Sequence, residues 1–500
     1  MQQRRNASKE EPSSSSLPLL QQQRPSTVGR GINGGKLSNG KVKKGMGLFI
    51  IAIICVPFVI SLYIVYKIVL GPFLSAHNLT VTFLPSSSSA LLVKNVGDIS
   101  TISGGYEYHI VFSTGCSLYQ DWQSYVFFYG AVLAKQPGTI TRIVSGCKDS
   151  TEEQKMRDIF YDEIHPMDPS GRLQLHITPD YSKLKNGKSF VYFNKPFGMK
   201  HWLENKLGFP NNPINENAIV ILVDPDQLIM RPFTNNDFTN TEWKFLSSKP
   251  YTKVVHGRPM GQLYGFGLQW KSQVNMTALG FPNSPVDQLS YKEAQAGYIV
   301  GPPYIATARD MYTIVTQWTI FAHGVHEQYP FLLAEMFAYC LGAAHQKLPH
   351  QTAQSFMISD IGAGKEEGWD YIDKIPDDEI CDNFNIDDVP NVLHYCQRYG
   401  MGNYFFGKRK LPKDFLSCES PLMAEPPKNV LQKYTYAYFP PNNRKDWTPI
   451  NAKRNAFAVC YMIKVLNEAA IHYKNHHCQS NTATNYEKTL LLSHGAPGVD

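Results

Sequence analysis

The stretch AIVILVDPDQLIMRPF at 218–233 decides the fold class of this chain. Its first six residues, at 218–223, are an uninterrupted apolar run, which is typical of a strand buried on both faces of a sheet. The run leads directly into DPDQ at 224–227, so two carboxylates follow the strand at positions i and i+2. A strand of this kind predicts an α/β fold with a mostly parallel central sheet and flanking helices.

An earlier part of the chain has the pattern of a strand–helix–strand unit. YHIVFST at 108–114 and ITRIVSG at 140–146 are predicted strands, and the apolar residues of 119–135 recur on one helical face between them. This succession indicates two parallel strands joined by a crossover helix. Further helices are expected near 306–321, 331–345 and 457–473.

The two carboxylates of DPDQ suggest a metal site. Ligands of α/β proteins bind at the carboxyl ends of the strands, and paired hard oxygen ligands there suit Mn²⁺ or Mg²⁺. Transfer of a sugar from a nucleotide diphosphate needs such a cation, because the leaving diphosphate gains negative charge. Asp-Pro-Asp is also ordinary turn chemistry, so the strand before it carries the argument. We predict that Asp224 and Asp226 are metal ligands and catalytic residues.

The N-terminus predicts a membrane anchor. Residues 1–45 hold nine Lys or Arg and two acidic residues, and 22 uncharged residues follow at 45–66. As a helix this stretch would rise about 33 Å, which spans the roughly 30 Å hydrocarbon core. The alternative is a cleaved signal peptide. The positive-inside rule places the basic tail in the cytosol and the rest across the membrane, as in a single-pass type II protein.

The charge of the rest of the chain is nearly balanced, because the formal net charge of +6 comes from the basic tail. A nucleic-acid-binding domain therefore gains no support. GQLYGFGLQW at 261–270 lacks the GxGxxG pattern of a dinucleotide site.

The cysteines and sequons fit a luminal location. Apart from Cys55, the chain has eight cysteines: Cys116, Cys147, Cys340, Cys381, Cys396, Cys418, Cys460 and Cys478. An oxidising lumen permits disulfides, although eight cysteines allow 105 pairings. There is no CxxC pair, so a cysteine zinc site is not expected. Asn78 and Asn275 begin N-x-Thr sequons and are predicted glycosylation sites.

Several segments resemble the plant and algal hydroxyproline O-arabinosyltransferases and the related peptidyl-serine α-galactosyltransferases. They are HIVFSTGCSLYQDWQSYVFFYGAV (109–132), QPGTITRIVSGC (136–147), FNKPFGMKHWLE (193–204), the 218–233 stretch and VLHYCQRY (392–399). The resemblance runs in order through roughly 106–470. It implies a GT-A type glycosyltransferase of the Golgi or ER membrane that keeps the anomeric configuration of a UDP-sugar. It also implies a protein acceptor that bears hydroxyproline or serine.

The donor sugar stays open between arabinose and galactose. Arabinosyltransferases of this family often carry Glu-Pro-Asp-His at the strand end, whereas DPDQ at 224–227 leans toward the galactosyltransferases. VLNEA at 465–469 leans the other way. Neither the acceptor residue nor the oligomeric state follows from the sequence.

The expected organisation has five parts. They are a disordered cytosolic tail (1–45), a transmembrane signal-anchor helix (46–70), a luminal stem (71–104), a GT-A domain (105–406) and a C-terminal extension packed on it (407–500).

Three further residues are expected to bind the cofactors. His394 in VLHYC is a predicted third metal ligand, which the resemblance favours over a hydrogen-bonded core histidine. Lys195, at a predicted helix start, would contact the donor diphosphate, and the alternative is a solvated surface lysine. Arg142 on the second strand would reach uracil or phosphate, or else pair with a carboxylate.

Two features are assigned to the acceptor side. Glu335 begins a predicted helix and would act as a base or stabilise the transition state, although an acid at a helix start also matches the helix dipole. VGPPYIA at 300–306 is expected to be a Gly-Pro loop that lines the acceptor groove, or a plain rigid turn.

Two other functions are weighed against the enzyme. One is a luminal protein that binds carbohydrate or Ca²⁺ without catalysis, and the other is a transferase fold that has lost its chemistry.

Overall fold

The computed structural model describes residues 104–492, apart from 118, 185, 236–250, 383, 385–388, 435–447 and 479–482. Pro85–Pro497 form one compact unit. The predicted cytosolic tail and anchor lie outside the described residues, as does the stem up to residue 103. Within the described part of the chain, no helix is both long enough and apolar enough to cross a membrane.

A seven-stranded sheet forms the centre of this unit, with the strand order β3-β2-β1-β4-β7-β6-β8. Its strands are β1 (Tyr108–Gly115), β2 (Thr139–Ser145), β3 (Leu173–Thr178), β4 (Ile219–Val223), β6 (Met260–Leu263), β7 (Val300–Thr307) and β8 (Gln351–Ala353). Strands β3, β2, β1 and β4 run parallel, and β7 is antiparallel to both β4 and β6. The predicted α/β fold with a mostly parallel sheet is therefore confirmed.

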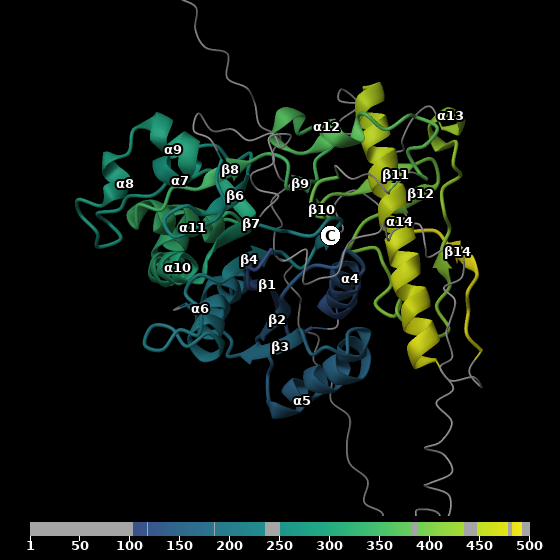
Figure 1. Cartoon of the computed structure of the whole chain (residues 1–500), viewed down its shortest axis with the longest axis horizontal. Helices are drawn as coiled ribbons and strands as arrows, with labels where there is room; N and C mark the ends of the chain where they lie inside the picture. Colours follow the sequence, from purple (N-terminus) through teal and green to yellow (C-terminus); the bar gives the residue numbers. More distant parts are fainter. Residues whose placement is uncertain are drawn as a thin grey trace, which may run out of the picture. The chain divides into compact units, whose positions relative to one another are not determined.

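Helices cover both faces of the sheet (Figure 1). The described α-helices are α4 (Tyr119–Leu133), α5 (Ser150–Ile159), α6 (Asn194–Lys206), α7 (Gln269–Ser272), α8 (Pro285–Gln288), α9 (Tyr291–Gly297), α10 (Ala308–Gln328), α11 (Ala334–His345), α12 (Trp369–Ile372), α13 (Val430–Lys433) and α14 (Pro449–His477). The expected helices near 306–321, 331–345 and 457–473 correspond to α10, α11 and the central part of α14.

Neighbouring residues of one strand belong to different cores. Ile110 and Phe112 of β1 lie in the core that α4 and α14 cover, whereas Val111 lies in the core under α6, α10 and α11. The alternation follows from the two-residue period of a strand. It also explains the uninterrupted apolar run of β4, because both of its faces are buried.

Three smaller sheets complete the described fold. They are β5 (Gln227–Ile229), β10 (Val392–His394) and β9 (Met357–Ile358) in that order; β11 (Tyr399–Met401) with β12 (Tyr404–Phe406); and β13 (Leu422–Met423) with β14 (Lys488–Leu490). Figure 1 shows α14 alongside β11 and β12 and next to α4. The described residues after 407 therefore share the core under α4.

The expectation for VGPPYIA at 300–306 was wrong, because this segment is the fully buried strand β7. Two prolines in a central strand remove ladder donors. The structure accommodates them at a register shift: Gly261 of β6 pairs with Tyr304, but the next residue pairs with Gly301. The two prolines fall within this irregularity, so their missing N–H groups cost the sheet few inter-strand hydrogen bonds. The segment is part of the core and is neither a loop nor a turn.

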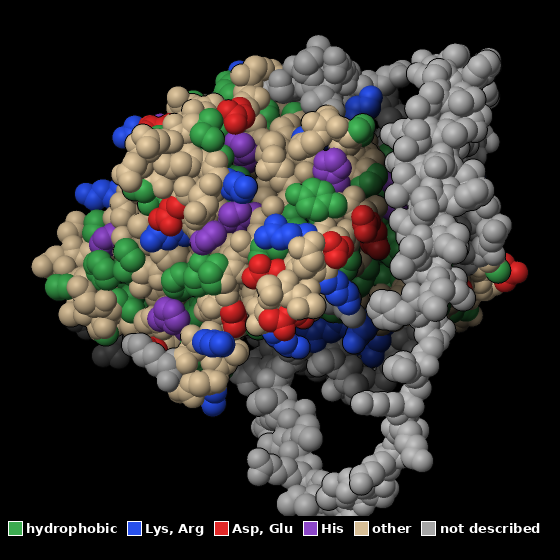
Figure 2. Space-filling model, turned by 90° about the horizontal axis from the view of Figure 1, so that it is seen from below, with side chains coloured by type: hydrophobic (Ala, Val, Ile, Leu, Met, Phe, Trp, Pro, Cys, Tyr) green, Lys and Arg blue, Asp and Glu red, His purple; other side chains and the backbone are tan. Residues whose placement is uncertain are grey.

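The described cysteines form three disulfides, Cys116–Cys147, Cys381–Cys460 and Cys418–Cys478. Cys340 is a buried free thiol and Cys396 an exposed one. The prediction of disulfides is thus confirmed. Figure 2 shows one face of the molecule, on which Lys and Arg side chains are interspersed with Asp, Glu and His.

Candidate active site

A tight turn fixes the DPDQ segment at the end of β4. The side-chain oxygen of Gln227 accepts from the backbone N–H of Asp224 at 3.0 Å, and its amide nitrogen donates to the carbonyl of Pro302 at 2.9 Å. The backbone N–H of Gln227 also donates to the carbonyl of Asp224. Gln227 is completely buried, so it ties the turn to β7. Sequence reasoning noted this glutamine only as a departure from a family pattern.

Strand β10 brings a histidine to the same turn. In the antiparallel pair of β5 and β10, His394 lies opposite Gln227, and the backbone N–H of Tyr395 donates to the carbonyl of Asp226. The ligand atoms of Asp224, Asp226 and His394 all lie within 4.8 Å of one another. The structure therefore brings together all three residues that the sequence suggested as metal ligands.

Asp226 is buried between two cationic partners. Its carboxylate lies 2.5 Å from Nζ of Lys408 and 3.3 Å from Nε2 of His394. Burial alone would raise the pKa of Asp226, but Lys408 and His394 outweigh it and hold that pKa well below its usual range. Burial likewise opposes the charged form of His394, yet Cys396 and Asp226 raise its pKa. The carboxylate of Asp226 is therefore ionised at any physiological pH.

Asp224 has a different set of neighbours. Its carboxylate lies 2.7 Å from Nζ of Lys195, at the start of α6. The same ammonium lies 3.4 Å from Oε1 of Glu335, at the start of α11. Although burial lowers the pKa of Lys195, Asp224 and Glu335 raise it above its ordinary value. Lys195 is mostly buried, so it is not the solvated surface lysine that was the alternative.

Glu335 is a buried carboxyl with a displaced pKa. Burial raises its pKa to about 7, against the opposing effect of Lys195, and the charge of Asp224 adds to the rise. Its Oε1 contacts Lys195 only as an ion pair and lacks a well-formed hydrogen bond. A carboxyl with a pKa near neutrality can exchange a proton at working pH.

Two site residues were missed by sequence reasoning. Lys408 follows β12 in GKRK at 407–410, which reads as an ordinary surface run. Tyr264 lies in the segment that was rejected as a dinucleotide loop. Its hydroxyl lies 3.5 Å from Nδ1 of His394, and its ring packs where a Cβ on Gly301 would otherwise be, 2.3 Å away. Nothing in the local sequence marks either residue, because both reach the site through the fold.

Arg142 lies in the middle of β2 and is almost completely buried. It donates to Oγ1 of Thr114 at 3.0 Å and pairs with the carboxylate of Asp121 at 2.8 Å. The structure therefore shows the carboxylate pairing that was one of the two expectations. Contact of Arg142 with a nucleotide stays a prediction.

The donor set of the cluster fits a hard divalent cation. Asp224 and Asp226 offer carboxylate oxygens and His394 offers one imidazole nitrogen, which suits Mn²⁺ better than Mg²⁺. Each carboxylate also contacts one lysine ammonium. Metal binding would thus replace or share these ion pairs rather than require new ligands.

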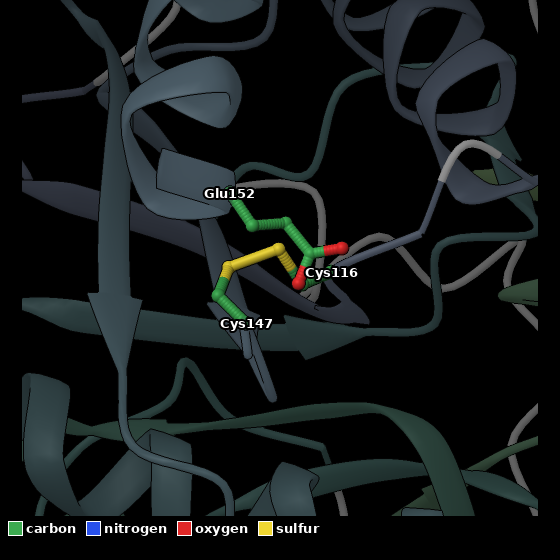
Figure 3. A group of neighbouring side chains, drawn as sticks. All are labelled: Cys116, Cys147 and Glu152. Atoms are coloured by element: carbon green, nitrogen blue, oxygen red, sulfur yellow. A yellow bond between two sulfur atoms is a disulfide. The ribbon is translucent and has the colours of Figure 1, made fainter. Parts of the chain in front are cut away.

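A second group, Cys116, Cys147 and Glu152, has the composition of a metal site but cannot be one. Its two sulfurs form a disulfide, and Figure 3 shows the Glu152 carboxylate beside that bond. Glu152 accepts from the backbone N–H of Lys148 at 2.7 Å. Because both thiols are consumed, the group offers one carboxylate only.

The two predicted glycosylation sites differ in what the structure describes. Asn78 lies outside the described residues. Asn275 is exposed, and its backbone bonds to the side chain of Gln328. Glycosylation of either asparagine stays a prediction.

Comparison with known proteins confirms the family that the sequence resembles. Residues 108–255 match the model described as the hydroxyproline O-arabinosyltransferase family N-terminal domain. The matched residues include strands β1, β2, β3 and β4 of the central sheet. The match is shorter than the 106–470 expected from the motifs.

Two curated relatives are peptidyl serine alpha-galactosyltransferases. The protein of Arabidopsis thaliana is 25% identical over 325 residues, which are 62% of this chain and 32% of the relative. The protein of Chlamydomonas reinhardtii is 20% identical over 318 residues, 60% of this chain and 35% of the relative. The chain thus spans about a third of the length of these relatives.

A solved structure of the galactosyltransferase LgtC, in complex with donor and acceptor sugar analogs, is also similar. It shares 11% sequence identity with a TM-score of 0.33, over 58% of this chain and 87% of that one.

Proposed function

We propose that this chain is a metal-dependent glycosyltransferase with a GT-A type domain. It transfers arabinose or galactose from a UDP-sugar to hydroxyproline or serine of secretory-pathway proteins. The observation that carries the proposal is the convergence of Asp224, Asp226 and His394 at the carboxyl end of β4. The family match over residues 108–255 and the names of the two curated relatives support the reaction and the protein acceptor.

The metal site defines how the donor would bind. A divalent cation held by the two aspartates and His394 would neutralise the charge that develops on the leaving diphosphate. Lys195 and Lys408 flank the same carboxylates. Each ammonium would shift toward a phosphate oxygen once the cation takes over its carboxylate.

We assign Glu335 to the acceptor side of the site. It lies behind Lys195, is almost fully buried, and has a pKa of about 7. Such a group would orient the acceptor hydroxyl or stabilise positive charge on the sugar ring. The leaving diphosphate would take the acceptor proton as the new bond to the anomeric carbon forms and the bond to diphosphate breaks. Attack on the face that the diphosphate leaves keeps the configuration of the donor.

A single-pass type II arrangement in the Golgi or ER membrane belongs to the same proposal. The uncharged stretch at 45–66 and the basic residues before it support this topology. A glycan on Asn78 or Asn275 would agree with it. Asn6 begins an Asn-Ala-Ser sequon in the basic tail, and a glycan on Asn6 alone would reverse the topology.

The direct test is a donor panel. The full chain is incubated with Mn²⁺, individual UDP-sugars and a peptide rich in serine and hydroxyproline, and the mass added to the peptide is measured. A single pentose or hexose addition that needs Mn²⁺ is expected. A non-catalytic carbohydrate- or Ca²⁺-binding protein would neither modify the peptide nor release UDP from any donor.

A further inference from the structure

The last two turns of α14 carry three histidines, within IHYKNHH at 471–477. His472 and His476 are four residues apart and therefore lie on one helical face. Their ring centroids are 4.1 Å apart and the ring planes differ by 26°. The ring of His477 lies further round the helix, 6.4 Å from that of His476.

Hydrogen bonds engage Nδ1 of each ring of the pair. Nδ1 of His476 lies 2.8 Å from the carbonyl oxygen of His472, so it must donate. Nε2 of His476 then carries a lone pair. Nδ1 of His472 lies 2.9 Å from the hydroxyl of Tyr125 on α4. When that oxygen accepts from Nδ1, Nε2 of His472 also carries a lone pair, which is the usual arrangement behind a ligating histidine.

The backbone that carries the pair is firmly held. Lys474 lies between the two histidines, is buried, and donates to the carbonyls of Ser417, Cys418 and Ser420. The next residue after the helix, Cys478, forms a disulfide with Cys418. The backbone beneath the two rings is therefore held in place before any ligand arrives, which reduces the entropy cost of binding one.

The charge state also suits a metal ion. Burial and the neighbouring histidines lower the pKa of His472 to about 4, so its ring is neutral at pH 7. In the part of the chain that the structure describes, neither His472 nor His476 forms an ion pair with a carboxylate. The negative end of the helix dipole lies at this terminus and favours a cation.

We propose that His472 and His476 bind a borderline divalent transition-metal ion, Zn²⁺ above all. Imidazole nitrogens suit Zn²⁺, whereas Mn²⁺ and Mg²⁺ prefer oxygen ligands. A tetrahedral Zn²⁺ with bonds of 2.0–2.1 Å holds two nitrogens about 3.3 Å apart. The two rings stack with their centres 4.1 Å apart, so the exposed ring of His476 must turn about its side-chain bonds to bring its Nε2 to this spacing, and water completes the coordination.

This site differs in selectivity from the candidate active site, which offers two carboxylates and a single imidazole. An ion at His472 and His476 links two consecutive turns of α14. Because His472 also contacts Tyr125 of α4, the ion reinforces the packing of α14 against α4. Because the unfolded chain does not hold the pair in place, the ion stabilises the folded state.

The test is calorimetric titration of Zn²⁺ into the untagged full chain in the presence of saturating Mn²⁺. His476→Ala is the central variant, because His476 is exposed and its loss removes no core packing. Asp226→Ala is the matched variant at the other site, and His165→Ala controls for histidine content. Circular dichroism checks that all variants are folded.

Zn²⁺ binding to wild type, Asp226→Ala and His165→Ala with equal affinity is expected. In His476→Ala the affinity should fall by more than the roughly 100-fold that loss of an outer-shell partner costs. Equal Zn²⁺ affinity in wild type and His476→Ala would overturn the proposal. So would Zn²⁺ binding that disappears in Asp226→Ala, because the ion would then belong to the active site.

Discussion

Asp224 and Asp226 lie two residues apart, yet their surroundings come from different parts of the chain. Asp224 faces Lys195, on the helix that covers one side of the parallel strands. Asp226 faces His394 and Lys408, which both come from the C-terminal part of the chain. The comparison teaches that the parallel strands supply the carboxylates, whereas distant segments supply their cationic partners. The site is therefore complete only when both parts have folded together.

The two carboxylates also differ energetically. The side chain of Asp226 is 10% exposed and has two partners, whereas that of Asp224 is 19% exposed. A buried charge that loses its partner is strongly destabilising. Substitutions around Asp226 should thus affect stability as well as metal binding, whereas those around Asp224 should affect mainly the binding of metal and donor.

The largest effect is expected from the aspartates themselves. Asp224→Ala and Asp226→Ala should each reduce transfer by more than about 100-fold, beyond the cost of losing an outer-shell partner. Glu335→Ala should cost less than either, because Glu335 does not contact the metal site directly. Turnover on one peptide measures the order, with exposed Asp287→Ala as the control, and NMR gives the product anomer. An inverted product, or Glu335→Ala as the most damaged variant, would refute the proposed mechanism.

Lys408→Met tests the C-terminal contribution. A hydrogen bond to a charged group contributes about 1.5–3 kcal/mol, so UDP affinity in Mn²⁺ should fall roughly 10- to 100-fold. Exposed Lys413→Met is the matched control. Calorimetry with UDP gives both values. If the two variants bind UDP equally, Lys408 is only the structural partner of Asp226.

A smaller effect is expected from Tyr264→Phe. The hydroxyl of Tyr264 orients Nδ1 of His394, and loss of such an outer-shell partner costs metal affinity about 10-fold or somewhat more. The measurement is the Mn²⁺ dissociation constant by electron paramagnetic resonance. Gly301→Ala, which displaces the Tyr264 ring, should have a similar effect. Wild-type Mn²⁺ affinity in Tyr264→Phe would remove this residue from the site.

The smallest effect concerns stability away from the site. Burial raises the pKa of Glu468 on α14 from 4.5 to about 7, with Lys464 acting in the opposite direction. The folded state retains a proton that the unfolded chain releases, so the free energy of unfolding falls as pH rises from 4.5 to about 7. Glu468→Gln should therefore stabilise the protein above pH 7, on the order of 1 kcal/mol after allowance for partial exposure. Urea unfolding at pH 4 and pH 8 checks this. A gain that is equal at both values would contradict the assignment.

The sequence predicts the parallel strands well because their signals are local. Short stretches rich in apolar residues mark β1, β2 and β4 in the sequence. The carboxylates of DPDQ follow β4 directly. The helix starts that carry Lys195 and Glu335 are also local features, which is why the sequence alone suggested both residues. The structure places Lys195 beside Asp224 and Glu335 beside Lys195.

The remainder of the site depends on pairing between distant segments. His394 reaches Asp226 only because β10 pairs with β5. Lys408 lies in a charged run that resembles any exposed surface. Strand β7 was mistaken for a loop because its prolines fit a central strand only through a register shift with β6. Such features follow from tertiary packing, so local residue preferences do not predict them.

The most direct test of the account is Mn²⁺ binding to the full chain, followed by electron paramagnetic resonance, in wild type, Asp224→Ala and His394→Ala. If the parallel strands and the C-terminal part jointly form one metal site, wild type binds one Mn²⁺ ion there. Each variant then lowers the affinity for that ion by more than about 100-fold. Wild-type affinity in His394→Ala together with lost affinity in Asp224→Ala would show that the strand end binds alone. Unchanged affinity in both variants would contradict the metal site altogether.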